Sequence, residues 1–246
     1  MRHNPEWKIM FWYPKFPTKQ NLWRSGEQDY PVKCQDFFPE VLKLPIMKMM
    51  IDLKDYGGDN KISEVHKSDF LRLHLLSTMG GLWSDMDIFY LKPMETLYFN
   101  VEDNKNIETF YCDHNYGHSI GFLMASQNNK FFKKLIEISK EEYNPTFYQA
   151  MGAMIFKNHF STSESINAIT PAFNMDMDVV YPHDATYFKE ILTQLQTRFT
   201  DKTIGIHWYG GHEVWKHFFY YTNGGLVNLP NNIIGNLLKN EREFTN

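Results

Sequence analysis

Residues 68–91 of the chain read SDFLRLHLLSTMGGLWSDMDIFYL and combine a helical pattern, a double glycine and the acidic pair Asp85 and Asp87. Apolar side chains recur three and four positions apart in the first half, which predicts a helix that Ser63 caps and Gly80-Gly81 ends. The second half, Leu82 to Leu91, predicts a strand. Because side chains alternate along a strand, we expect Asp85 and Asp87 to face the same side.

Further strands and helices are expected on both sides of this stretch. Strand patterns cover Trp7–Tyr13 and Thr203–Trp208, and helical patterns cover Phe38–Leu44, Ile46–Leu53 and Asn129–Glu142. Alternation of strands and helices favours the α/β class. The length of 246 residues fits one large α/β domain or two small ones, and because no repeat or linker-like tract occurs we expect one domain with an elaborated C-terminal part.

The composition is that of a globular protein, with 43% hydrophobic residues, 22% charged residues and a net charge of −4. It excludes disordered, collagen-like and coiled-coil classes, and the slight acidity disfavours binding of nucleic acid by bulk charge. The apolar stretch Ile9–Tyr13 is far shorter than the roughly 20 residues of a membrane span. The sequence has two cysteines and no N-glycosylation site of the type Asn-x-Ser/Thr in which x is not Pro. Both features favour a reducing cytoplasm. We therefore expect a cytoplasmic protein with no transmembrane segment.

The two acidic residues of the second half form a candidate cation site. Neighbouring carboxylates repel each other unless a cation or water lies between them, and their hard oxygens suit Mg²⁺ or Mn²⁺. An isolated D-x-D pair more often lies at a solvent-exposed strand edge without a cation. Asp69 and Arg72 share a helix face, where they either form an ion pair or present an acceptor and donors to a polar ligand. Trp83 offers either a flat ring for a base or sugar or a core contact.

The segment Ser68–Asp87 resembles the sugar-binding region of the D-x-D glycosyltransferases, a family that includes mannosyltransferases, lactosylceramide galactosyltransferases and, more remotely, the large clostridial glucosylating toxins. The shared pattern is S/A-D-x-x-R, a short apolar helix, and G-G-x-[YW]-x-D-x-D, and every element is present here. The resemblance implies a GT-A fold, which is a single Rossmann-like α/β domain with a mixed central sheet flanked by helices. It would span residues 1–246, with a donor and metal half at about 1–100 and an acceptor half at about 101–246.

The resemblance also implies roles for single residues. In that family the positions of Asp69, Arg72 and Asp85 bind the donor sugar, and those of Trp83 and Ser84 lie on the nucleotide side. Asp85 and Asp87 correspond to the positions that hold Mn²⁺ or Mg²⁺, and the catalytic set is Asp85, Asp87 and Arg72. The cation neutralises the charge of the diphosphate leaving group.

A weaker match covers Ile206 to Trp215, where His207 is the expected third metal ligand and His212 competes for that role. The serine that relatives carry before the tryptophan is missing here. Gln149 stands near a turn where relatives carry a T-G-P-like sequence. The resemblance places Gln149 and Trp215 on the acceptor side, whereas the ordinary interpretation of Gln149 is a buried helix start.

Relatives open with a strand of the type I-P-K-I-I-H-x-x-W, whereas this sequence opens at the landmark that follows, Asn4–Trp12. Either the opening strand is absent from the sequence, or Lys8–Tyr13 replaces it. In both cases the nucleotide pocket would differ from that of the relatives.

The resemblance implies a metal-dependent glycosyltransferase that moves a sugar from a nucleotide donor, a UDP-sugar, to a hydroxyl acceptor, and it also implies retention of configuration. The acceptor stays open among glycans, lipids, proteins and modified nucleic acid. A metal-dependent hydrolase or phosphoesterase is the first alternative, and a non-catalytic carbohydrate-binding protein is the second. His212 and His217 are five residues apart rather than four, which disfavours a zinc peptidase.

Overall fold

The computed structural model describes residues 3–18, 37–99, 106–114, 117–183, 199–210, 233 and 235–237. The chain divides into two compact units. Unit 1 consists of Met1–Arg24, Pro45–Met86 and Pro93–Met177, and unit 2 of Ser25–Leu44, Asp87–Lys92 and Asp178–Asn246. The border between Met86 and Asp87 falls inside the acidic motif. The expected organisation into one domain with a donor half and an acceptor half stays a prediction.

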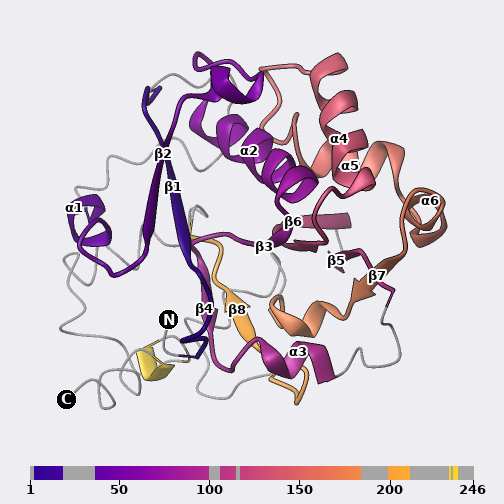
Figure 1. Ribbon diagram of the computed structural model, residues 1–246. Coiled ribbons are helices and arrows are strands. Elements are labelled where there is room, and N and C mark those ends of the chain that lie inside the picture. Colours follow the sequence, from indigo (N-terminus) through magenta and orange to yellow (C-terminus); the bar gives the residue numbers. More distant parts are fainter. Residues whose placement is uncertain are drawn as a thin grey trace. The chain divides into compact units, whose positions relative to one another are not determined.

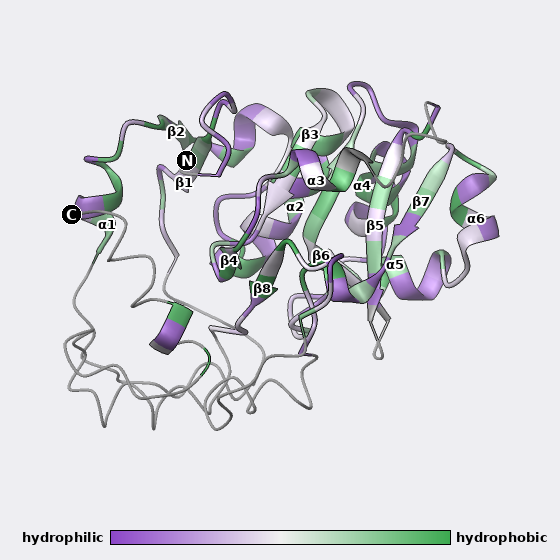
Figure 2. Ribbon diagram, turned by 90° about the horizontal axis from the view of Figure 1, so that it is seen from below, coloured by the Kyte–Doolittle hydropathy of each residue, from purple (hydrophilic) through white to green (hydrophobic). Residues whose placement is uncertain are grey.

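A four-stranded mixed sheet forms the centre of unit 1 (Figure 1). Its order is β3 (Gly81–Ser84), β6 (Gly117–Ala125), β5 (Thr109–His114) and β7 (Ala172–Met175). β6 pairs antiparallel with both β3 and β5, whereas β5 and β7 are parallel. Hydrophobic segments lie on β5 and β6 (Figure 2), where Tyr111, Phe122 and Leu123 are completely buried. The expected mixed central sheet is confirmed.

Helices of unit 1 pack on this sheet and on one another. α2 (Glu64–Thr78) contacts α4 (Lys130–Glu141), β3 and β6, and α5 (Ala153–His159) contacts β6 and α4. The expected cap is present, because Ser63 accepts a hydrogen bond from the amide of His66. Asn129 caps α4 in the same way by accepting from the amide of Phe132. The unit also contains the shorter helices η1 (Leu53–Tyr56), α3 (Glu95–Phe99) and α6 (Ser163–Asn167).

Two strands of unit 1 form a separate parallel pair, β1 (Met10–Pro14) and β2 (Met47–Ile51). β1 agrees with the expected strand near the start of the chain. The helix expected over Ile46–Leu53 is wrong, because most of this run is β2 and only its last residue, Leu53, begins η1. The physical reason is pairing over a long sequence distance, which a short apolar run does not reveal.

The strand expected over Leu82–Leu91 is interrupted at the acidic motif. β3 ends at Ser84, and the amide of Asp85 donates to the carbonyl of Gly121 in β6 (2.8 Å). After a turn, β4 (Ile88–Tyr90) pairs antiparallel with β8 (Gly205–His207) in unit 2. Asp85 and Asp87 therefore do not lie on one face of a single strand, because the chain leaves one sheet partner for another between them.

Unit 2 is built around β4 and β8. The amides of Ile204 and His207 donate to the carbonyls of Val179 and Val180, which ties β8 to the segment after η2 (Met177–Val179). Ile88, Val180 and Ile206 are buried in this unit. The short helix α1 (Phe38–Val41) also belongs to unit 2. The packing fixes His207 at the end of β8.

Gly80 links α2 to β3 in a conformation that other residues rarely adopt. Its φ is +70°, and a Cβ atom there would lie 2.6 Å from the backbone nitrogen of Gln127 and from the carbonyl carbon of Ser126. Gly81 has a φ of +95°, but a Cβ atom there would meet nothing within 4 Å. The double glycine thus ends α2 and lets β3 begin close to the end of β6.

The two glycines give a matched pair of variants. Gly80→Ala should lower the free energy of unfolding by more than about 2 kcal/mol, because it adds a backbone clash to the left-handed conformation. Gly81→Ala should cost about 1 kcal/mol, because only the backbone conformation opposes it. Urea unfolding of both variants measures the difference. Equal losses would contradict the close approach at Gly80.

Candidate functional site

Helix α2 places Asp69 and Arg72 one turn apart on one face. The Nη2 atom of Arg72 lies 3.2 Å from Oδ1 of Asp69 and 3.3 Å from Oδ1 of Asp85. Its Nη1 atom donates to the carbonyl of Ile120 in β6 (2.5 Å). One guanidinium therefore joins the helix, the central sheet and the first aspartate of the acidic motif.

Trp83 orients the same aspartate from β3. Its indole Nε1 donates to Oδ1 of Asp85 (2.8 Å), and the guanidinium of Arg72 lies over its ring, 5.1 Å from the centroid. Trp83 also packs against the core of unit 1, which agrees with the core contact considered for it, whereas a role of its ring toward a base or sugar stays a prediction. Ser84 follows in β3, and its hydroxyl donates to the carbonyl of Asp85 (3.0 Å).

Burial differs sharply within this cluster. The side chains of Asp69 and Arg72 are 3% and 6% exposed, whereas that of Asp85 is 29% exposed. A ligand therefore reaches Asp85 more easily than the other two. Burial raises the pKa of Asp69 to about 6, although Arg72 opposes the shift and Asp85 adds to it. The cluster thus keeps a carboxyl group that gives up its proton near neutral pH.

The turn before α5 covers Asp69. A Cβ atom on Gly152 would lie 3.0 Å from Oδ2 of Asp69 and would also collide with Ile120. Gln149, three residues earlier, is exposed and accepts the amide hydrogen of Gly152 through its carbonyl (3.2 Å). The ordinary interpretation of Gln149 as a buried helix start is therefore wrong. The sequence did not predict the contact between Gly152 and Asp69. The only local sign of such a close approach is the presence of a glycine in a short turn.

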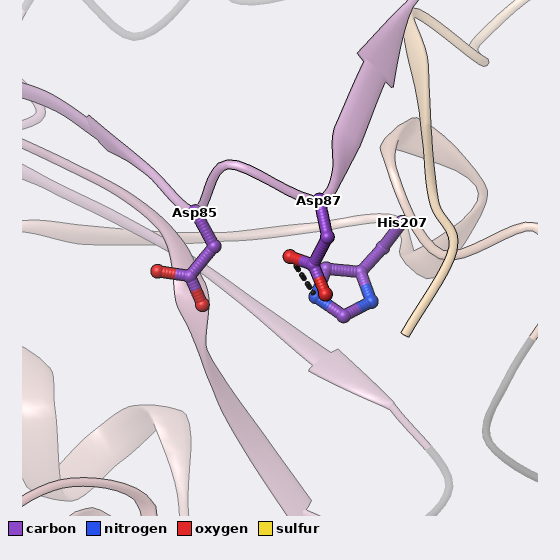
Figure 3. Close-up of side chains that lie close together, drawn as sticks. All are labelled: Asp85, Asp87 and His207. Carbon is purple, nitrogen blue, oxygen red and sulfur yellow. Dashed lines mark ion pairs between the residues drawn. The ribbon is translucent and has the colours of Figure 1, made fainter. Parts of the chain in front are cut away.

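Asp87 and His207 form the second part of the site, within unit 2. Nε2 of His207 lies 3.1 Å from Oδ1 of Asp87, as the dashed line in Figure 3 marks. The amide of Gly210 donates to Oδ2 of Asp87 (2.9 Å), and the amide of Trp208 donates to its carbonyl. Burial raises the pKa of Asp87, but His207 and the amide of Gly210 outweigh it, so this pKa lies below its ordinary value. Asp87 is therefore ionised at neutral pH.

The Asp87–His207 pair fits a divalent cation by the chemistry of its donors, which are carboxylate oxygens and an imidazole nitrogen. The amide of Tyr209 lies 3.3 Å from Nδ1 of His207 and donates to it. Nε2 therefore carries the ring proton and donates to Asp87. A cation can bind at Nε2 only when the ring proton is no longer on that nitrogen.

Two residues expected near the site, His212 and Trp215, lie outside the described residues. The structure brings Asp69, Arg72, Trp83 and Asp85 together in unit 1, and Asp87 with His207 in unit 2. Gly210, whose amide binds Asp87, was not singled out from the sequence. A backbone donor carries no side-chain signal, which is why the sequence did not reveal it.

Comparison with known proteins gives a family match over the first part of the chain. Residues 1–108 match a family model described as a glycosyltransferase sugar-binding region containing a DXD motif. The match includes the Asp69–Arg72–Asp85 cluster and Asp87 and ends before His207. No curated protein matches the chain significantly. Among the helices that the structure describes, none is long and apolar enough to cross a membrane.

The raised pKa of Asp69 predicts a pH-dependent stability. The folded protein holds this proton more tightly than the unfolded chain, so protonation of Asp69 stabilises the folded state. This stabilisation is full below about pH 4 and is lost as pH rises to about 6. Between about pH 4.5 and about pH 7.5 the free energy of unfolding loses about 2 kcal/mol for this reason. Asp69→Asn removes this loss, so the unfolding free energy of the variant relative to wild type should increase by that amount.

Denaturant unfolding at both pH values measures the effect. Asp55→Asn, which changes an exposed carboxylate of η1, is the control and should keep the pH dependence of the wild type. An Asp69→Asn variant with the same pH dependence as wild type would show that Asp69 is not a buried acid with a raised pKa.

Proposed function

This chain carries, over residues 1–108, the sugar-binding region of the DXD-containing glycosyltransferases, and we propose that it is a metal-dependent transferase acting on a nucleotide sugar. The proposed donor is a UDP-sugar and the proposed acceptor is a hydroxyl group. The single observation that carries the proposal is the bridge from Asp69 through Arg72 to Asp85, at the first aspartate of the motif.

The proposed metal ligands are Asp85, Asp87 and His207, which together offer carboxylate oxygens and one ring nitrogen. Asp85 stands two residues before Asp87, so the chain itself keeps the two carboxylates near each other. The proposed ion is Mn²⁺ or Mg²⁺, which would neutralise the charge of the diphosphate leaving group.

The residues of unit 1 then bind and orient the donor. Both Arg72 and Trp83 engage Oδ1 of Asp85, which holds this carboxylate in one orientation and directs its other oxygen to the ligand. Asp69 is almost fully buried, so we propose that it acts mainly by orienting Arg72 and meets a sugar hydroxyl at the pocket wall. Trp83 and Ser84 are the proposed contacts of the nucleotide.

The proposed reaction breaks the bond between the anomeric carbon and the phosphate oxygen and forms a bond from that carbon to the acceptor oxygen. The acceptor hydroxyl gives its proton to the departing diphosphate, so no protein base is required. Retention of configuration is proposed to follow from attack on the face that the diphosphate leaves. Gln149 and Trp215 are the proposed acceptor-side residues, and the acceptor is a glycan, lipid, protein or modified nucleic acid.

Asp87→Asn tests the proposed metal site. It replaces a carboxylate by a neutral amide of the same shape, so Mn²⁺-dependent transfer and donor hydrolysis should fall by about hundredfold or more while the fold persists. Turnover of UDP-sugars with and without Mn²⁺ is the measurement, and circular dichroism checks the fold. Full activity of this variant would rule out the proposed role of Asp87.

Asp113→Asn is the matched control, because the carboxylate of Asp113 contacts His118 and Asn174 rather than the residues of the motif. It should leave the metal-dependent activity unchanged. In the same assays, turnover at equal rates with and without an acceptor would favour the hydrolase or phosphoesterase. Glycan binding with no nucleotide binding would favour the carbohydrate-binding protein.

Asp69→Asn tests the donor-sugar pocket. The variant should bind a UDP-sugar about tenfold or more weakly, because a buried hydrogen-bonding group is changed, and should bind free UDP as wild type does. Thermal-shift titrations of UDP, UDP-sugars, GDP-sugars and CMP-sugars with Mn²⁺ measure both affinities. Equal weakening for UDP and the UDP-sugar would contradict a role at the sugar.

A further inference from the structure

His66 lies in α2 one helical turn before Asp69, so the two side chains share a face of the helix. It is completely buried and is not part of the pattern that the glycosyltransferase region shares. Its ring stands edge-on to the ring of Tyr143, with 5.2 Å between the centroids. Tyr143 begins the turn of residues 143–152 that joins α4 to α5.

Both ring nitrogens of His66 bind this turn. Nε2 lies 2.9 Å from the carbonyl oxygen of Phe147 and 3.2 Å from that of Tyr148. Carbonyl oxygens only accept, so Nε2 carries the proton and donates to both. Burial lowers the pKa of His66, so the ring is neutral near pH 7 and Nδ1 accepts from the Tyr143 hydroxyl (2.9 Å).

The same turn reaches Asp69 at its far end. Within it the amide of Ala150 donates to the carbonyl of Phe147, and that of Gly152 donates to the carbonyl of Gln149. Gly152 then lies against the carboxylate of Asp69, where even a methyl group would crowd it. The turn therefore contacts α2 at two points, first at His66 and then at Asp69.

We propose that His66 is a positioning residue for the donor-sugar site, which fixes the turn 143–152 so that Gly152 stays against the carboxylate of Asp69. The inference rests on the proposed function, because it assigns the turn as a wall of the pocket that holds the transferred sugar. Loss of the His66 hydrogen bonds removes the tie between α2 and the carbonyls of Phe147 and Tyr148 and lets this wall shift. Small displacements of a binding wall are costly, since binding depends on geometry at the scale of about 1 Å.

His66→Phe tests the proposal, because phenylalanine keeps a flat ring beside Tyr143 and removes both nitrogens. The KM for the UDP-sugar should rise about tenfold or more, with the affinity for free UDP unchanged within about twofold. Hydrogen–deuterium exchange should rise for the amides of residues 147–152 and not for those of β6. This second readout does not depend on activity.

Conservative and control variants separate positioning from a general loss of stability. His66→Gln places an amide donor near the two carbonyls, so it should restore most of the affinity for the UDP-sugar. Tyr143→Phe removes only one hydroxyl and should give a smaller rise in KM with an intact fold. His74→Phe makes the same substitution in α2, where the ring packs against Tyr56 and Phe70, and should leave KM unchanged.

Several results would overturn the inference. If His66→Phe and Tyr143→Phe both keep the wild-type KM and exchange pattern while the wild type transfers sugar, the positioning role fails and the proposed function stands. If His66→Phe loses affinity for UDP and the UDP-sugar equally, or His66→Gln gives no rescue, the role at the sugar also fails. A wild-type protein that neither binds nor turns over any nucleotide sugar would overturn the proposed function together with this inference.

Discussion

The buried guanidinium of Arg72 is the interaction on which the site in unit 1 depends. It lies between the carboxylates of Asp69 and Asp85 and also binds the carbonyl of Ile120, so it connects α2 with the central sheet. Burying these charges costs free energy that the mutual contacts only partly return. The raised pKa of Asp69 is one sign of that cost. Such a cluster is an expensive way to stabilise a fold, which agrees with a role in binding a polar ligand.

The chain changes its sheet partner between Asp85 and Asp87, and this change gives Asp87 its own neighbours. Up to Asp85 the chain follows β6, and after Asp87 it follows β8, where His207 and the amide of Gly210 bind the second carboxylate. A regular strand would place both acids on one face and give them the same neighbours. The interruption instead gives each carboxylate its own partners, with Arg72 and Trp83 on the first and His207 on the second. Asp85 is thus held by one guanidinium and one indole, and Asp87 by an imidazole and backbone amides.

Local patterns predicted much of this structure. Ser63, the apolar spacing of α2 and Gly80-Gly81 predicted a helix and its ends correctly, because capping and glycine conformations act over a few residues. Asn129 and the pattern after it predicted α4 equally well. The run Ile46–Leu53 was predicted wrongly, because a short apolar run fits a helix or a strand, and only pairing with β1 makes most of it a strand. The strand expected over Leu82–Leu91 was wrong in its continuity for a similar reason, because the change of pairing from β6 to β8 lies outside the local sequence.

The sequence by itself determined the helix that carries Asp69 and Arg72, the glycine turn after it and the spacing of the acidic residues, since these depend on neighbours in the chain. It also indicated a glycosyltransferase region, which the family match over residues 1–108 supports. Only the tertiary structure decided that Arg72 bridges two acids, that Gly152 covers Asp69 and that His66 holds the turn beside them. Those contacts join residues up to 83 positions apart, from Asp69 to Gly152. Burial and hydrogen bonding at such separations are set by the packing of whole elements, which no local pattern specifies.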